Sequence, residues 1–266
     1  MSSYLYANDS PVYYMKENII LWTAAFIITF LSGFLQSISS TYYPVSGTFG
    51  IEGKKVSYKL DRLHYGKDPY RILIRTDIDS LSGKVEYRRG REKWNIIPLK
   101  NAKDILFGDM PAQKAGTEME YRVLIFYSDN SYFVPSAKPV SIKFLGKISP
   151  FINALYYLTL FAGLLLSTRT GLDFFNENEK IKKLGLFTSI IFFVNAFIAA
   201  PLRKTYEMGE IGTNAPPVLQ IFPAGSIVLF ALWVAAVIII FNIKRYKRAA
   251  IISALIALIA FQIFTF

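Results

Sequence analysis

The chain has 266 residues and a formal net charge of +11, and 53% of its residues are hydrophobic. A mean hydropathy of +0.32 is too apolar for an ordinary soluble domain. Cysteine is absent, which excludes a disulfide framework, a thiolate zinc site and a cysteine nucleophile. The basic surplus would suggest nucleic acid in a soluble chain, but part of it flanks apolar segments, where positive charge has a topological cause. We therefore expect no nucleic-acid partner.

The first apolar run, Ile19 to Leu35, contains no charged residue and is long enough to cross a hydrocarbon core of about 30 Å. Residues 1–17 before it are expected to form a short tail. A cleavable signal peptide is the alternative, because Ser37 and Ser39 are small and two positions apart. The apolar core of a signal peptide has about 7–15 residues. This run is longer, so an uncleaved anchor is favoured.

The segment from Tyr42 to Lys147 is polar and carries 19 of the 30 Lys and Arg and 12 of the 19 Asp and Glu. Its short alternating or apolar runs are separated by Gly, Pro, Asn and Asp, a pattern typical of an antiparallel β-sandwich. Strands are expected near 45–51, 54–61, 70–77, 83–89, 93–99, 119–128 and 131–145, with a further one at Asp104 to Phe107.

Two local features favour an immunoglobulin or fibronectin-III-like sandwich. Tyr121 stands early in a late strand after Gly116, where a tyrosine corner would hydrogen-bond to the preceding connection. Val85 to Tyr87 faces Trp94 to Ile97 across an Arg-Gly turn, as expected for a hairpin.

Four further apolar runs follow the polar segment: Pro150–Leu166, Leu184–Ala200, Val218–Ile243 and Ala249–Phe266. The expected fold is a mixed membrane protein, with five transmembrane α-helices and the sandwich inserted between the first and second. The expected domains are 1–41 for the tail and first helix, 42–147 for the extracytoplasmic sandwich and 148–266 for a four-helix transmembrane bundle.

The basic residues of the short loops predict the orientation. Loops 167–183 and 244–248 each carry four Lys or Arg, whereas loop 201–217 carries two. Because basic loops stay on the cytoplasmic side, we expect the amino terminus inside, and residues 42–147 and the carboxyl terminus outside.

Few residues are candidates for chemistry. No Asp, Glu, Lys, Arg or His lies within the five apolar runs, which argues against a proton-coupled transporter. Asn153 and Asn195 are candidates for buried polar groups that hydrogen-bond between helices. His64 is the only histidine, in a predicted loop, so a histidine-based metal cluster is excluded. We expect no catalytic residue, no metal site and no cofactor.

Basic side chains gather at a predicted hairpin tip and in loop 201–217. Solvated residues are the simplest interpretation, and contact with a partner or with anionic lipid head groups, about 1 kcal/mol per basic residue, is the alternative. The possible interaction surface consists of Arg88, Arg89, Arg91, Lys93, Arg203 and Lys204. Loop 201–217 is also expected to pack against the sandwich through Ile211, Pro216 and Pro217.

Four short motifs support a resemblance to a known family: Pro44-Val-Ser-Gly-Thr-Phe-Gly-Ile, Tyr70-Arg-Ile-Leu-Ile, Val85-Glu-Tyr-Arg-Arg and Ser167-Thr-Arg-Thr-Gly-Leu-Asp173. With them the chain resembles bacterial multi-pass proteins of the cytoplasmic (inner) membrane that have an extracytoplasmic immunoglobulin/fibronectin-III-like domain. The resemblance implies this compartment and this architecture, and it implies no activity.

Three functions are compatible with these features. The first is a non-enzymatic accessory, scaffold or assembly protein in the lipid bilayer whose sandwich binds another membrane or periplasmic protein. The alternative is a small transporter or channel component formed by the C-terminal helices. The third is a membrane-tethered enzyme with paired carboxylates, Asp77 or Asp79 with Glu207 or Glu210.

The alternation of loop charge predicts how reporter fusions behave. A reporter that is active only outside the cytoplasmic membrane should be active after Phe266 and silent at Asn178. Enzymatic assay of both fusions in intact cells measures this, and the reverse pattern would contradict the orientation.

Overall fold

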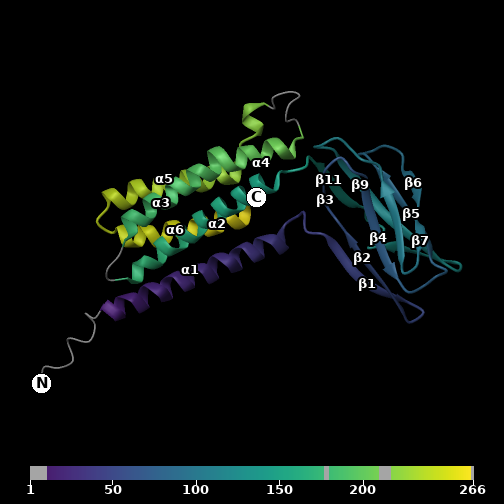
Figure 1. Cartoon of the computed structure of the whole chain (residues 1–266), viewed down its shortest axis with the longest axis horizontal. Helices are drawn as coiled ribbons and strands as arrows, with labels where there is room; N and C mark the ends of the chain where they lie inside the picture. Colours follow the sequence, from purple (N-terminus) through teal and green to yellow (C-terminus); the bar gives the residue numbers. More distant parts are fainter. Residues whose placement is uncertain (1–10, 177–179, 210–216, 265–266) are drawn as a thin grey trace, which may run out of the picture. The chain divides into compact units, whose positions relative to one another are not determined.

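The computed structural model describes residues 11–176, 180–209 and 217–264. They divide into two compact units (Figure 1). The helical unit comprises the described residues of Met1–Ser40, Ser149–Lys204 and Pro216–Phe266, and the β unit comprises those of Thr41–Ile148 and Thr205–Ala215.

The β unit contains two sheets. One has the strand order β1-β2-β4-β8-β7, and the other has the order β3-β11-β9-β5-β6 with β10 also paired to β9. Only β3 and β11 pair in parallel. The strands are β1 (Val45–Ile51), β2 (Lys54–Leu60), β3 (Leu63–Tyr65), β4 (Tyr70–Thr76), β5 (Ser82–Arg88), β6 (Asn95–Pro98), β7 (Lys100–Ala102), β8 (Ile105–Met110), β9 (Glu118–Tyr127), β10 (Asn130–Val134) and β11 (Val140–Leu145).

Strand β4 illustrates how the sequence fills the core of this unit. Successive residues alternate between buried and exposed, which places Tyr70, Ile72 and Ile74 inside. Val123 and Ile125 of β9, in the other sheet, belong to the same hydrophobic cluster. Both sheets therefore bury side chains in one core.

Most of the predicted strands are confirmed, as is the hairpin, in which Val85 pairs with Ile97. The single strand predicted over 131–145 is wrong, because it divides into β10 and β11. Pro135 and Pro139 interrupt it, since proline has no N–H to donate to a sheet. The short strands β3 and β7 were not predicted, because three residues carry too little periodicity. His64 lies in β3 rather than in a loop, with Nε2 2.8 Å from the Asp68 carbonyl oxygen.

Tyr121 is fully buried, but its hydrogen bond differs from the predicted one. Its hydroxyl donates to the main-chain oxygen of Asp61 (2.9 Å), after β2, and not to the connection before β9. The Asp61 N–H donates to the Tyr70 hydroxyl (2.9 Å), and the two phenol oxygens are 3.3 Å apart. Burial raises the pKa of both phenols. These two tyrosines therefore fasten the end of β2 to both sheets.

The end of helix α4, from Thr205, and the residues that follow it belong to the β unit. The N–H of Gly146 donates to the Glu207 carbonyl oxygen (2.8 Å). A Cβ on Gly209 would lie 2.8 Å from the Cβ of Ala115. Packing of this part of loop 201–217 on the β unit is thus confirmed. Of the residues expected to make the contact, Ile211 and Pro216 lie outside the described residues, and Pro217 belongs to the helical unit.

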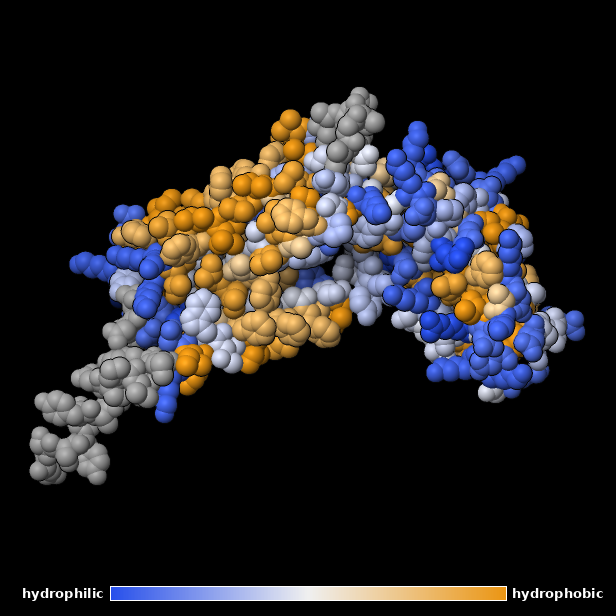
Figure 2. Space-filling model, in the orientation of Figure 1, coloured by the Kyte–Doolittle hydropathy of each residue, from blue (hydrophilic) through white to orange (hydrophobic). Residues whose placement is uncertain are grey.

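Within the described residues, five helices are long and apolar enough to cross a membrane, which indicates a membrane protein. These candidate spans are Lys16–Ser39, Pro150–Phe175, Ile181–Glu207, Ala224–Asn242 and Tyr246–Ile263. The elements are α1 (Pro11–Ser39), α2 (Pro150–Leu172), a 3-10 turn (Asp173–Phe175), α3 (Ile181–Val194), a π-helical turn (Asn195–Ala199), α4 (Ala200–Glu207), a second 3-10 turn (Val218–Gln220), α5 (Ala224–Asn242) and α6 (Tyr246–Ile263). Figure 2 shows apolar residues over most of the visible face of the helical unit and hydrophilic ones over most of the β unit.

Several helix ends differ from the prediction. Helix α1 begins at Pro11, inside the expected tail, and α2 continues beyond Leu166 to Leu172. The third span continues through the π-helical turn into α4, and the fourth helix begins only after Pro223, because proline is favoured at a helix start. Small residues let α2 and α6 approach closely, since a Cβ on Gly171 of α2 would lie 2.6 Å from the Cβ of Ala254.

The tyrosine pair generates a stability prediction. In residues 42–147 expressed alone, a soluble β-rich fragment by our prediction, Tyr121→Phe should lower the free energy of unfolding by about 1–3 kcal/mol, because the Asp61 carbonyl loses its buried donor. Urea denaturation followed by circular dichroism measures the change.

Tyr132→Phe in β10 is the matched control, because no hydrogen bond of its hydroxyl is found among the described residues. It should change the unfolding free energy by less than about 0.5 kcal/mol. A helical spectrum of the wild-type fragment, or equal effects of the two variants, would contradict the prediction.

Candidate functional site

The hairpin of β5 and β6 carries the predicted basic tip, and a tryptophan braces it. The guanidinium carbons of Arg88 and Arg122 lie 4.4 and 4.5 Å from the centroid of the Trp94 ring. Cation–π contacts of this kind contribute about 0.5–1 kcal/mol at exposed sites. Trp94 therefore joins the turn to β5 and β9, the strands that carry the two arginines.

Two ion pairs hold the same arginines. Arg88 binds Glu120 (Nη2 to Oε2, 2.7 Å), and Arg122 binds Glu86 (Nη2 to Oε2, 2.7 Å). Each arginine also donates from Nε at 2.8 Å, so both contacts use two nitrogens. Lys84 and then Arg122 hold the pKa of the Glu86 carboxyl below its usual value. The Arg88 side chain is therefore held on the sheet by its contacts with Glu120 and Trp94.

The remaining residues of the tip are exposed. Arg89, Arg91 and Lys93 lie in the turn between β5 and β6, with Glu92 as the one acidic neighbour. The Glu92 N–H donates to the Arg89 carbonyl oxygen (3.1 Å), which closes the turn. The tip thus presents three cations from a braced hairpin.

The other two predicted surface residues, Arg203 and Lys204, belong to the helical unit, whereas the tip residues belong to the β unit. Arg203 is buried, with its guanidinium carbon 4.4 Å from the Tyr156 ring centroid and 5.1 Å from that of Tyr157. The expectation of an exposed Arg203 is wrong, because α4 continues α3 and turns this side chain onto α2. Lys204 is half-buried.

The helical unit contains a buried ion pair that the sequence analysis missed. Arg169 of α2 donates from Nη1 to Oδ1 of Asp173 (2.7 Å), and these residues are 2% and 0% exposed. The pair lies inside the candidate span Pro150–Phe175. The inference that the spans carry no ionisable residue is therefore wrong.

Groups from three other parts of the chain contact the two side chains of this pair. Asn18 of α1 accepts from Arg169 Nη2 (2.8 Å), and Trp22 offers its ring 5.5 Å from the guanidinium carbon. Asn176 Nδ2 donates to Asp173 Oδ1 (2.8 Å), and the Lys180 N–H donates to Oδ2. The carboxylate therefore has donors on both oxygens.

Polar groups also connect the helices around this pair. Trp233 Nε1 donates to Ser167 Oγ (3.0 Å), which links α5 to α2. Asn195, fully buried in the π-helical turn, donates to Thr159 Oγ1 (2.9 Å), so its expected interhelical bond is confirmed. Asn153 is half-buried. We find no group of three or more metal-binding side chains among the described residues.

We find no hydrogen bond among the described residues that joins the carboxylates proposed for an enzyme, Asp77, Asp79 and Glu207, to one another. Asp77 and Asp79 follow β4, where their main-chain oxygens accept from Lys54 Nζ (3.5 Å) and Asn101 Nδ2 (2.9 Å). Glu207 contacts Gly146 through its main chain, and Glu210 lies outside the described residues.

Comparison with known proteins identifies no family for the chain. No protein-family model and no curated protein matches the chain. A solved structure titled "Crystal structure of Br derivative BhCBM56" matches with 10% sequence identity and a TM-score of 0.24, over 39% of this chain and 95% of that one. A likeness this low carries no argument about fold or function.

The buried pair of Arg169 and Asp173 predicts that losing one charge destabilises the chain more than losing both. Asp173→Ala should destabilise the full chain by about 3–5 kcal/mol, because it leaves Arg169 buried without its counterion. Replacing both residues, Arg169→Met with Asp173→Leu, should cost much less. Thermal unfolding in mild detergent, followed by size-exclusion chromatography, measures the loss.

Lys244→Ala is the control, because Lys244 is exposed. It should leave the melting temperature unchanged. A double variant as unstable as Asp173→Ala would show that the pair does not act as a unit.

Proposed function

We propose that this chain is a non-enzymatic accessory, scaffold or assembly protein of a bacterial cytoplasmic membrane, and that its β unit binds a partner protein. In this proposal the two sheets form an immunoglobulin-like sandwich outside the membrane, and the amino terminus lies inside. The partner contacts the hairpin tip through an acidic surface.

The observation that carries the proposal is the braced tip. The hairpin is held in the unbound chain by the ion pairs to Glu86 and Glu120 and by the shared Trp94 ring. A preorganised surface loses less conformational entropy on binding than a flexible one. Arg89, Arg91 and Lys93 are exposed at its end, where complementary charge would speed and orient association.

The ionisable pair in the helical unit also fits a scaffold. Buried ionisable residues in transporters usually face a substrate or proton path. Here Asp173 accepts hydrogen bonds from Arg169, Asn176 and the Lys180 main chain, so the carboxylate is already occupied by the protein itself.

The alternative is a small transporter or channel component formed by the C-terminal helices. One observation favours it: the third span contains a π-helical turn with the buried Asn195 at its start. Such turns are often found at functional sites.

A crosslinking experiment in the native membrane tests the proposal, since the chain has no cysteine. Arg91→Cys, labelled with a photoactivatable maleimide, should give one discrete adduct with a partner protein. Adding Arg89→Glu and Lys93→Glu should lower the yield about fivefold, the effect of about 1 kcal/mol.

Lys138→Cys is the control, an exposed position of the same unit outside the tip. It should give no such adduct. Equal adducts from both positions, or none from either, would overturn the proposal. Solute flux through the purified protein in liposomes would then favour the transporter.

A further inference from the structure

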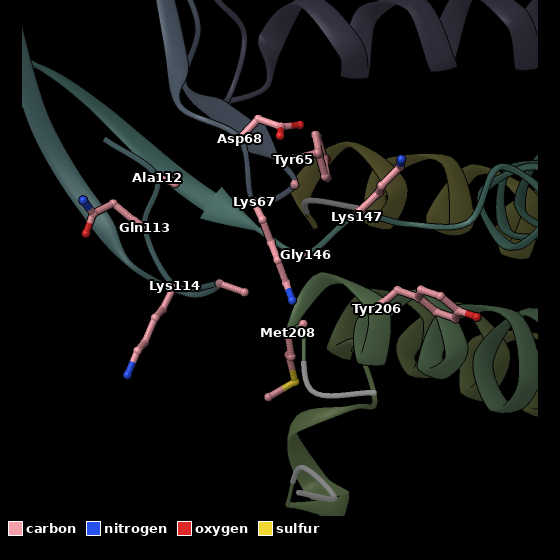
Figure 3. A pocket seen from close by; sticks show the side chains of 13 residues that line it. Tyr65, Lys67, Asp68, Ala112, Gln113, Lys114, Gly146, Lys147, Tyr206 and Met208 are labelled. Carbon is pink, nitrogen blue, oxygen red and sulfur yellow. The ribbon is translucent and has the colours of Figure 1, made fainter. Parts of the chain in front are cut away.

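The β unit contains a large open cavity, which is lined by residues of β3 and of the connections that follow β3 and β11, and by the end of α4 and the residues after it. Its volume is about 1110 Å³. The walls come from the β3–β4 connection, the connection before β9, the residues after β11 and the segment Tyr206 to Gly209 (Figure 3). This volume is slightly above the range of about 300–1,000 Å³ that is typical of small-ligand pockets.

The charge on these walls has one dominant sign. Lys67, Lys114 and Lys147 line the cavity, and Asp68 is the one carboxylate among the lining residues. No salt bridge found among the described residues involves any of the three lysines. Three ammonium groups against one carboxylate therefore give the lining a net positive charge.

The lysines stand on three separate connections of the lining. In Figure 3 the side chain of Lys67 points toward the Met208 wall, and those of Lys114 and Lys147 leave the rim in other directions. A lysine side chain has a flexible four-carbon stem and three donors at its end. The three ammonium groups can thus turn toward an anion from different sides, and Tyr65 and Tyr206 add phenol groups to the lining.

Close backbone packing fixes the Tyr206–Gly209 wall of the cavity. Gly146 donates to the Glu207 carbonyl oxygen (2.8 Å), and a Cβ on Gly146 would collide with the Tyr206 main-chain oxygen. Gly209 has a φ of +68°, which favours glycine. The Gly209 N–H donates to the Tyr206 carbonyl oxygen (3.0 Å). The wall toward which Lys67 points is therefore built by specific contacts.

We propose that this cavity binds a phosphate-bearing ligand, held by Lys67, Lys114 and Lys147. Lysine ammonium groups bind phosphate oxygens as point charges through short charge-assisted hydrogen bonds. The phosphate ester belongs either to a lipid head group or to a soluble molecule. This site is separate from the hairpin tip and does not depend on the function proposed for it.

The experiment uses the full chain in a neutral detergent. Gln113→Cys, on the lining, carries a polarity-sensitive fluorophore as the reporter. It is titrated with short-chain phosphatidylglycerol, short-chain phosphatidylcholine and glycerol 3-phosphate. Saturable binding of phosphatidylglycerol alone assigns a lipid ligand, and saturable binding of glycerol 3-phosphate assigns a soluble ester; either result supports the proposal.

Variants with matched charge decide whether the lysines are responsible. Lys67→Ala and Lys147→Ala should each weaken binding about fivefold, the effect of about 1 kcal/mol. Lys59→Ala, an exposed lysine of β2 outside the cavity, should leave the affinity unchanged. No saturable signal, equal affinity for phosphatidylcholine, or an unchanged affinity of the Lys67→Ala/Lys147→Ala double variant would each overturn the proposal.

Discussion

The cost of burying charge away from water constrains the helical unit more than any other interaction. An isolated buried arginine or aspartate is expensive, and a pair is tolerated only when hydrogen bonds satisfy the remaining groups. Asp173 meets this condition on both oxygens, and Arg169 meets it at Nη1 and Nη2, by recruiting Asn18 from α1 and the main chain at Lys180, ahead of α3. Among the described residues only Arg169 Nε of this pair has no hydrogen-bond partner. Helices far apart in sequence are thus brought to one point, where the position of each is set by directional bonds.

Apolar packing between helices is less directional, so the polar links around that point supply the specificity. Ser167 meets Trp233, and Asn195 meets Thr159, each across two helices. Small residues bring a further pair of helices together, where Gly171 of α2 lies against Ala254 of α6. The β unit shows the same principle, because hydrogen bonds of Tyr70 and Tyr121 fix the end of β2 against the core.

Local patterns of sequence were enough to predict most strands, the hairpin and the five apolar helices, because alternation and long apolar runs reflect local burial. They did not predict the partner of Tyr121, since Asp61 is 60 positions away and only the tertiary fold brings it near. Arg169 was assigned to a loop because a charge was taken to end a span, whereas its neutralising partner follows four residues later. Arg203 was expected on the surface for the same reason, and the aromatic rings that cover it could not be inferred from spacing.

At the candidate sites, the basic tip could be predicted from the sequence. The lysine-lined cavity could not, because its walls come from four distant segments.

The β unit is discontinuous in sequence, since Thr205 to Gly209 belongs to it although α2 and α3 intervene. During synthesis all eleven described strands leave the ribosome before this last piece exists. The Gly146 N–H then has no Glu207 acceptor, and the cavity has no Tyr206–Gly209 wall, until α2, α3 and α4 have been made. The cavity is therefore completed only when most of the chain has been translated. Any ligand it holds would bind the nearly finished protein and not the nascent domain.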